Sequence, residues 1–185
     1  RDLREEGLFL RGVKSVKGYH TGISLYEIDP LNRKHYFFYR FPGFSDPEST
    51  LKQEDIDANY VARAKAFAFT EASVRREPSR GAAFKAAGIA REGGLITLYD
   101  PNFRPSLWKS RHEANAISMK AIRLADVVTP NESEAALITG KRNVTQMLKE
   151  LLCFGPRIVA IKRGARGSIV GSGSQVEVIP AFRVK

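Results

Sequence analysis

The chain of 185 residues has 43% hydrophobic residues and a formal net charge of +10. It can therefore bury a core, and it has no apolar run long enough to span a membrane. Its 30 basic residues are scattered among 20 acidic ones, which argues against a nucleic-acid-binding arm and favours small anionic ligands. We expect a soluble, cytoplasmic protein without a nucleic-acid or membrane partner. The single cysteine, Cys153, excludes an internal disulfide and a cysteine metal cluster, and we interpret it as a core residue.

The first part of the chain predicts a small antiparallel sheet. Residues 1–19 are typical of a helix end and a connection, without the apolar stretch of a secretory signal. Residues 21–27 and 35–40 predict two strands joined by a polar turn, with no helix between them. The second strand is aromatic on both faces. We expect the pair, within residues 20–42, to be a lid covered by a ligand, a partner subunit or the main body, with an ordinary buried strand as the alternative.

From residue 66 onward, strands and helices alternate, which is typical of an α/β protein with a parallel sheet. The expected strands are 66–69, 95–99, 126–129 and 157–161, with a final pair near 168–170 and 176–179, and the expected helices are 79–91, 111–124, 132–138 and 144–154. The segment 171–174 joins the last two strands. We interpret it as a hairpin turn, because no helix follows it as in a phosphate loop.

A first polar segment, YDPNFRPSLW at 99–108, directly follows a predicted strand. Asp100, Asn102 and Arg104 then lie at the carboxyl end of that strand, where open parallel sheets bind ligands. Arg104 can bind a carboxylate or a phosphate through two hydrogen bonds. The alternative is that the segment is a plain turn and Arg104 a surface charge.

Two further segments pair a strand end with polar residues. In the segment 125–134, Asn131 and Glu134 are three apart at a helix start, so they either cap the helix or face a phosphate-bound Mg²⁺ through water. In the segment 159–168, Lys162 ends a strand and Gly164 follows it. These two residues can offset phosphate charge and admit a nucleotide close to the backbone, or they form an ordinary turn.

Taken in order, the segments DPNFRPSLW, ADVVTPNESEAALITG and VAIKRGARGS closely resemble those of the ribokinase-like (PfkB-type) carbohydrate kinases, over nearly the whole chain. The resemblance implies an α/β fold, ribokinase-like, with a central mostly parallel sheet, helices on both faces and a small β lid over the sugar, so that residues 43–185 are a partial kinase core. It implies transfer of the γ-phosphate of ATP to a sugar hydroxyl with Mg²⁺. We also expect a homo-oligomer through the lid. By resemblance, Asn131, Lys162 and Gly164 lie by the nucleotide and its phosphates, Glu134 serves the metal, and Asp100 and Asn102 support the site.

Within the family, Tyr39, Arg40 and Arg104 look most like the substrate site of 2-keto-3-deoxygluconate kinases, in which two arginines hold a carboxylate. Tyrosines that such enzymes use are replaced here by Ser24 and Phe38. A fructokinase is therefore the alternative, since it needs no carboxylate clamp.

Two segments that define the family are absent from these 185 residues: a glycine-rich sugar-binding stretch and a Gly-Ala-Gly-Asp segment. In the family the second supplies the anion hole and the aspartate that acts as general base. We therefore expect this piece alone to be inactive. A non-catalytic binding or assembly module is the alternative from another class, and a Gly-Ala-Gly-Asp segment downstream in the same reading frame would distinguish the two.

Overall fold

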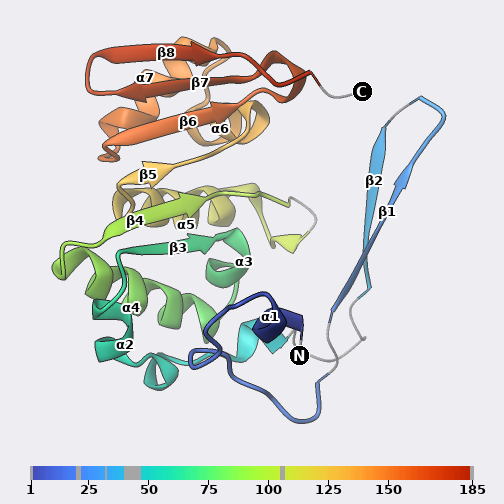
Figure 1. The fold of residues 1–185 in the computed structure, drawn as a ribbon. Helices are drawn as coiled ribbons and strands as arrows, with labels where there is room; N and C mark the ends of the chain where they lie inside the picture. The colour runs from blue at the N-terminus through green and yellow to red at the C-terminus, as the bar shows by residue number, and fades with distance from the viewer. Residues whose placement is uncertain (1, 20–21, 32, 40–46, 105–106, 184–185) are drawn as a thin grey trace. The chain divides into compact units, whose positions relative to one another are not determined.

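The computed structural model describes residues 2–19, 22–31, 33–39, 47–104 and 107–183. The chain forms two compact units, Arg1–Leu51 and Lys52–Lys185, and each is described here by itself (Figure 1). The segment boundaries predicted near residues 19 and 42 adjoin positions outside the described residues. The division into three segments therefore stays a prediction.

The first unit is built around a β-hairpin. It contains the short helix α1 (Asp2–Glu5), the antiparallel strands β1 (Ile23–Ile28) and β2 (Lys34–Tyr39), and the 3₁₀ helix η1 (Pro47–Thr50). Ile23 pairs with Tyr39 at one end of the hairpin, which confirms the predicted antiparallel strand pair. In the connecting turn, Asp29 Oδ1 accepts the backbone N–H groups of Leu31 at 2.9 Å and Arg33 at 2.8 Å. This aspartate explains why the polar turn forms here.

The hairpin exposes apolar side chains on both of its faces. Leu25 and Tyr26 are neighbours in β1, so they point to opposite faces, and they are 58% and 63% exposed. Tyr36 and Phe37 of β2 are exposed as well. An isolated two-stranded hairpin is marginally stable in water, and what covers the apolar side chains of this one stays a prediction.

The second unit is a six-stranded sheet whose strands follow one another in chain order (Figure 1). Four parallel strands come first, β3 (Ala66–Thr70), β4 (Ile96–Asp100), β5 (Val127–Val128) and β6 (Ile158–Lys162). The antiparallel strands β7 (Ser168–Ser172) and β8 (Gln175–Ile179) complete the sheet. Ser172 pairs with Gln175, which confirms the predicted hairpin turn between them.

The helices of the second unit also follow the predicted alternation. They are α2 (Ala58–Ala62), α3 (Glu71–Val74), α4 (Ser79–Glu92), α5 (Arg111–Arg123), α6 (Glu132–Thr139) and α7 (Val144–Cys153), with the 3₁₀ turns η2 (Gln53–Asp55) and η4 (Gly164–Arg166). The four longer helices are the predicted ones. The sequence did not predict α2 and α3, because four or five residues are too few to show a helical period of apolar positions.

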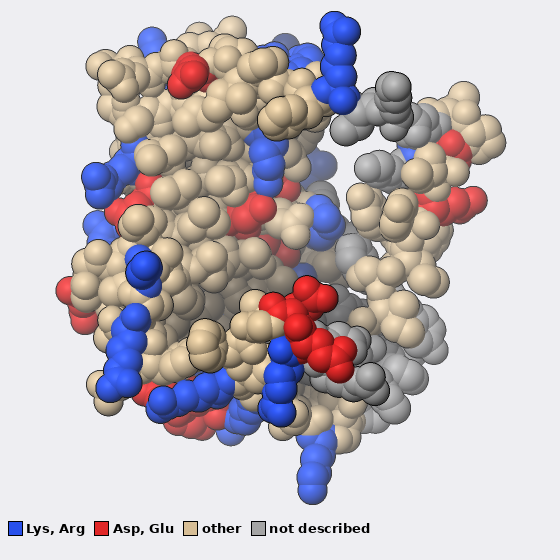
Figure 2. All heavy atoms as spheres, in the orientation of Figure 1, with Lys and Arg blue, Asp and Glu red and all other residues tan. Residues whose placement is uncertain are grey.

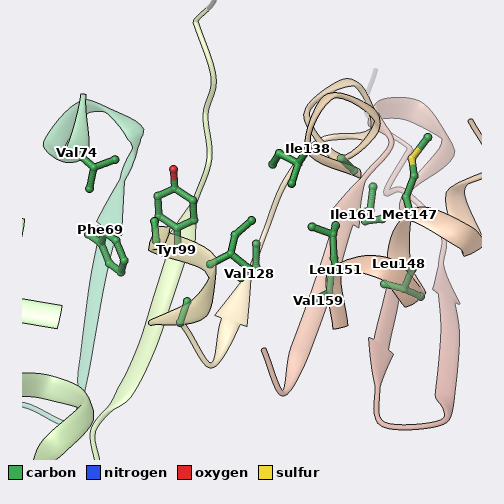
Figure 3. Packing of buried hydrophobic residues seen from close by; sticks show 14 of the residues in the cluster. Phe69, Val74, Tyr99, Val128, Ile138, Met147, Leu148, Leu151, Val159 and Ile161 are labelled. Carbon is green, nitrogen blue, oxygen red and sulfur yellow. The ribbon is translucent and has the colours of Figure 1, made fainter. Parts of the chain in front are cut away.

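The core lies between the sheet and these helices. Figure 3 shows Tyr99 between Phe69 and Val128, one residue from each of three neighbouring strands. The rings of Phe69 and Tyr99 are 5.0 Å apart. Helix α4 contributes alanines to the core, among them Ala83 and Ala87, and such small side chains let a helix lie close to a sheet. The buried face thus aligns the ends of β3, β4 and β5.

In the described residues, the crossover helices pack on one face of the sheet, whereas the family resemblance implies helices on both faces. The buried strand residues are register partners, such as Phe69 with Tyr99 and Tyr99 with Val128. Each connection moves one strand further in the same direction, and right-handed crossovers then place their helices on the same side. On the other face Ile96 is 55% exposed.

Cys153 is exposed, so its interpretation as a core residue was wrong. Helix α7 buries Met147, Leu148 and Leu151, which recur at helical spacing on one face. Cys153 is two positions beyond Leu151 and therefore lies on the opposite side of the helix. The apolar residues next to Cys153 in the sequence did not reveal its exposure, because the helical spacing of the apolar positions decides which face of α7 is buried.

At the amino end of the sheet, Asp126 links β4 to β5. Its Oδ2 accepts the backbone N–H of Thr97 at 2.9 Å and lies 2.8 Å from the Thr97 hydroxyl. Burial acts to raise the pKa of Asp126, but the Thr97 hydrogen bonds and the positive charges of Arg157 and Arg91 outweigh it and lower the pKa. The ionised carboxylate therefore stabilises the fold.

The variant Asp126→Asn is expected to be less stable than the natural chain at neutral pH, with a deficit that shrinks on acidification. The unfolded chain has an aspartate pKa of about 3.9. Because the folded-state pKa of Asp126 is lower, its contribution is complete above that value and is lost as the pH falls through the folded-state pKa. Urea unfolding of both proteins from about pH 7 to about pH 3 measures the effect. A deficit that stays constant over this range would contradict it.

Two observations concern the partners that the sequence argues against, nucleic acids and membranes. On the face in Figure 2, lysine and arginine side chains do not form one continuous patch, and acidic side chains lie among them. Within the described ranges, none of the helices combines the length and apolarity needed to cross a membrane. The absence of a nucleic-acid partner stays a prediction.

Candidate active site

Three adjacent strand ends bring Asp100, Asn131 and Lys162 together. Asp100 is the last residue of β4 and Lys162 the last of β6, while Asn131 follows β5 and forms a parallel bridge with Lys162. The backbone N–H of Lys162 donates to the carbonyl of Pro130 at 2.8 Å. Since β4, β5 and β6 are parallel, these polar residues share the carboxyl edge of the sheet, where α/β proteins bind ligands.

The Asp100 carboxylate holds the Lys162 ammonium group. Lys162 Nζ lies 3.0 Å from Oδ2 and 3.1 Å from Oδ1 of Asp100, and the backbone N–H of Asn102 donates to Oδ1 at 3.3 Å. Asn102 has a positive φ of 35°, a conformation that asparagine tolerates better than most residues. Asp100 thus orients its neighbours, and Lys162, with 49% of its side chain exposed, presents its charge at the edge.

Asn131 and Glu134 form the predicted capping box at the start of α6. Asn131 Oδ1 accepts the N–H of Glu134 at 2.9 Å, and Glu134 Oε2 accepts the N–H of Asn131 at 2.8 Å. The second oxygen, Oε1, accepts the backbone N–H of Phe103 at 2.8 Å. Glu134 therefore joins the helix after β5 to the loop after β4.

A pocket of about 290 Å³ lies beside this carboxylate. Its lining combines apolar, polar and charged side chains: Phe103, Arg111, Asn131, Ser133, Glu134 and Leu137. Among the described residues, no group of three or more His, Cys, Asp or Glu side chains gathers as a metal site. The pocket is suited to a ligand with a negative charge, because Arg111 and the amino end of α6 both attract such a charge.

Arg104 is half-buried, and its positive charge influences the pKa of a buried acid, Glu71. Arg104 Nη1 lies 3.4 Å from the carbonyl of Phe103. Glu71 follows β3 and pairs with Arg75 at 3.3 Å. Burial raises the pKa of Glu71, while the charge of Arg75, the indole N–H of Trp108 and the charge of Arg104 oppose that rise. Arg104 therefore faces an acidic group at the neighbouring strand end.

The turn after β6 is basic and is held by one acid. Glu132 Oε2 lies 3.3 Å from Arg163 Nε and 2.7 Å from Arg166 Nη2. Gly164, at the start of η4, has a φ of +59°, and no described atom lies within 4 Å of a Cβ built on it. The turn thus leaves open backbone at Gly164 next to Lys162.

The structure does not place the predicted substrate residues of the lid against this edge. Arg40 lies outside the described residues, and Tyr39 is described only as the backbone end of β2. Both precede the boundary between the two units. Of the predicted substrate residues, Arg104 alone is described in the second unit.

The comparisons with known proteins decide the family. The model of the pfkB family carbohydrate kinases matches residues 1–185. The chain belongs to the PfkB family. The three sequence segments predicted this membership, and it is confirmed. Fructokinase-1 of Oryza sativa subsp. japonica is 31% identical over 184 residues, which are 99% of this chain and 56% of that protein.

Two solved structures support the fold of this PfkB-family chain. Fructokinase from Vibrio cholerae O395, with fructose, ADP and calcium ion bound, matches with a TM-score of 0.85 at 23% identity, over 100% of this chain and 58% of that chain. Aminoimidazole riboside kinase from Salmonella enterica, with aminoimidazole riboside and an ATP analog, matches with a TM-score of 0.81 at 17% identity, over 100% and 58%. The ribokinase-like α/β fold is thereby confirmed, and the chain spans little more than half the length of these proteins.

Three features of the site in this PfkB-family chain were not found from the sequence. They are the bond from Phe103 to Glu134, the buried pair of Glu71 and Arg75, and the hold of Glu132 on the basic turn. For Glu132 the one available signal was its place in the first turn of a predicted helix, where acids are common. The bond from Phe103 to Glu134 spans 31 positions between two elements, for which the local pattern carries no signal. Glu71 and Arg75 are only four positions apart, but the sequence predicted neither the short helix α3 nor the burial of the pair.

Proposed function

We propose that this chain is part of an ATP-dependent sugar kinase of the fructokinase type, which transfers the γ-phosphate of ATP to a hydroxyl of fructose. The observation that carries the proposal is the meeting of Asp100, Asn131 and Lys162 at three adjacent strand ends in a PfkB-family chain. The rice and Vibrio cholerae fructokinases support fructose as the sugar. They favour it over 2-keto-3-deoxygluconate, the sugar acid that the arginines predicted.

Lys162, Gly164 and Asn131 are proposed to serve the nucleotide. The Lys162 ammonium offsets phosphate charge, and the open backbone at Gly164 lets the nucleotide approach. The proposed role of Glu134 toward Mg²⁺ fits its donor set. Each Glu134 oxygen accepts one backbone N–H, so each keeps a lone pair for a water of the ion, and Mg²⁺ retains its waters. When bound, the ion neutralises charge on the transferred phosphoryl group.

The experiment that tests the proposal measures ADP release by the complete protein that contains this chain. ATP and Mg²⁺ are supplied with fructose, 2-keto-3-deoxygluconate, ribose or a nucleoside. We expect fructose to give the strongest response. A stronger response to another sugar would overturn the assignment of fructose. Silence across the panel from a folded protein would overturn the kinase proposal and favour a non-catalytic binding or assembly module.

The variant Arg104→Ala tests the rival assignment of a sugar acid. A charge-assisted pair of hydrogen bonds contributes about 1.5–3 kcal/mol, roughly 10- to 150-fold in kcat/KM. We expect the variant to lose about that factor on 2-keto-3-deoxygluconate and clearly less on fructose. Arg123→Ala, an exposed site on α5, is the control and should change neither. Equal losses on both sugars would show that Arg104 does not recognise a carboxylate.

The exposed hairpin is proposed to join two copies of the protein through one face and to cover the sugar with the other. Leu25→Asp and Tyr26→Asp place a charge on opposite faces. We expect one variant to lower the molar mass found by light scattering and the other to raise KM for fructose. The control is Glu27→Gln, in the same exposed strand. An unchanged mass in both variants would contradict assembly through the hairpin.

A further inference from the structure

The Glu134 carboxylate does more than cap its helix. It is 5% exposed, and its two oxygens accept backbone N–H groups from two different elements. The bond with Asn131 is the local one of the capping box. The bond with Phe103 spans 31 positions of sequence, and capping does not require it.

Phe103 lies directly before Arg104, so this bond fixes the backbone at the proposed sugar-binding arginine. The loop leaves β4 at Asp100, and Pro101, which is buried, has no N–H with which to anchor it. Further along, the Phe103 ring packs near that of Trp108, at 6.3 Å. The amide of Phe103 therefore anchors the loop after β4 to α6. Because Phe103 directly precedes Arg104, this anchor determines where the arginine lies.

The position of Glu134 strengthens the two hydrogen bonds that its carboxylate accepts. The carboxylate lies in the first turn of α6, where the positive end of the helix dipole stabilises a negative charge. Hydrogen bonds to an ionised acceptor are stronger than neutral ones, and low exposure protects them from competing water. In Glu134→Gln, the side-chain amide has only one acceptor oxygen for the two backbone N–H groups. Its NH₂ group then faces the second N–H, with which it cannot form a hydrogen bond.

We infer that Glu134 is a positioning residue for the acceptor sugar, because its carboxylate holds the Arg104 loop through the N–H of Phe103. The inference rests on the proposed function, and it adds a second task to the proposed role of Glu134 toward the metal. The same carboxylate then ties the sugar side of the site to the phosphate side, so one substitution disturbs sugar binding from a residue that does not contact the sugar.

The test uses Glu134→Gln and Glu134→Ala in the complete protein, with two readouts. Hydrogen–deuterium exchange of the Phe103 amide reports the bond directly and needs no activity. We expect exchange to rise about tenfold or more in Glu134→Ala, as for a lost charge-assisted bond, and to a smaller extent in Glu134→Gln. The control Glu150→Gln changes a partly exposed acid in α7, whose contact with Lys141 is 3.9 Å, and should leave the exchange unchanged.

The second readout separates the positioning task from the metal task. We expect KM for fructose to rise about fivefold in Glu134→Gln, together with any rise in the half-saturating Mg²⁺ concentration that its role toward the metal causes, while KM for ATP stays within about twofold of the natural protein. A higher Mg²⁺ requirement with an unchanged KM for fructose would overturn the inference. Unchanged Phe103 exchange in Glu134→Ala would overturn it as well. If no sugar is phosphorylated, the proposed function fails, and the exchange still decides whether Glu134 holds the loop.

Discussion

Replacing Arg75 by alanine is expected to lower the free energy of unfolding by about 3–5 kcal/mol, because it leaves a buried carboxylate without its partner. The side chains of Arg75 and Glu71 are 5% and 2% exposed, and their closest atoms are 3.3 Å apart. Because both side chains are almost inaccessible to water, water does not compensate for the lost charge. Urea unfolding followed by circular dichroism measures the change.

Two comparisons separate this effect from a general loss of arginine. Arg76→Ala removes the exposed neighbour and should change stability by no more than about 0.5 kcal/mol. The double variant Glu71→Gln, Arg75→Met should recover most of the loss, because neither charge of the buried pair remains.

Burial raises the pKa of Glu71, so the Glu71 carboxylate takes up a proton more readily in the folded protein than in the unfolded chain. Acidification should therefore reduce the deficit of Arg75→Ala. Equal effects of Arg75→Ala and Arg76→Ala would contradict the prediction.

Gly167→Ala is expected to destabilise the protein by about 3 kcal/mol or more, from backbone strain of about 1–3 kcal/mol and steric overlap of a similar size. Gly167 has φ +78° and ψ −136°, a region that residues with a side chain avoid. A Cβ built there lies 2.0 Å from the carbonyl oxygen of Ile179 and 2.8 Å from Ala181 N. These are backbone atoms, which cannot rotate away.

Gly164→Ala is the matched control in the same turn. Its φ is also positive, at +59°, but a Cβ there meets no described atom within 4 Å. Only the backbone cost of about 1–2 kcal/mol is then expected. Thermal unfolding of both variants makes the comparison. Similar melting temperatures would show that the contact with Ile179 yields easily, and would contradict the predicted difference.

Much of the architecture was predictable because its signals are local. The alternating strands and helices, the turn between β7 and β8 and the capping box of Asn131 with Glu134 each depend on residues a few positions apart. The same holds for the polar strand ends, since a proline or glycine after an apolar run marks where a strand stops. The family followed from the resemblance of three short segments, at 100–108, 125–140 and 159–168, to those of the PfkB-type kinases.

The remaining features depend on distances that no local pattern encodes. The exposure of Cys153 depends on which face of α7 meets the sheet. In the described part of the chain, the direction of successive crossovers decides which face of the sheet the helices cover. Sequence by itself determined the PfkB family, the order of the elements and the residues at the strand ends. The tertiary structure alone decided that Glu134 holds Phe103, because such a bond forms only when separate elements pack together. It also decided that the pair of Glu71 and Arg75, four positions apart in sequence, is buried.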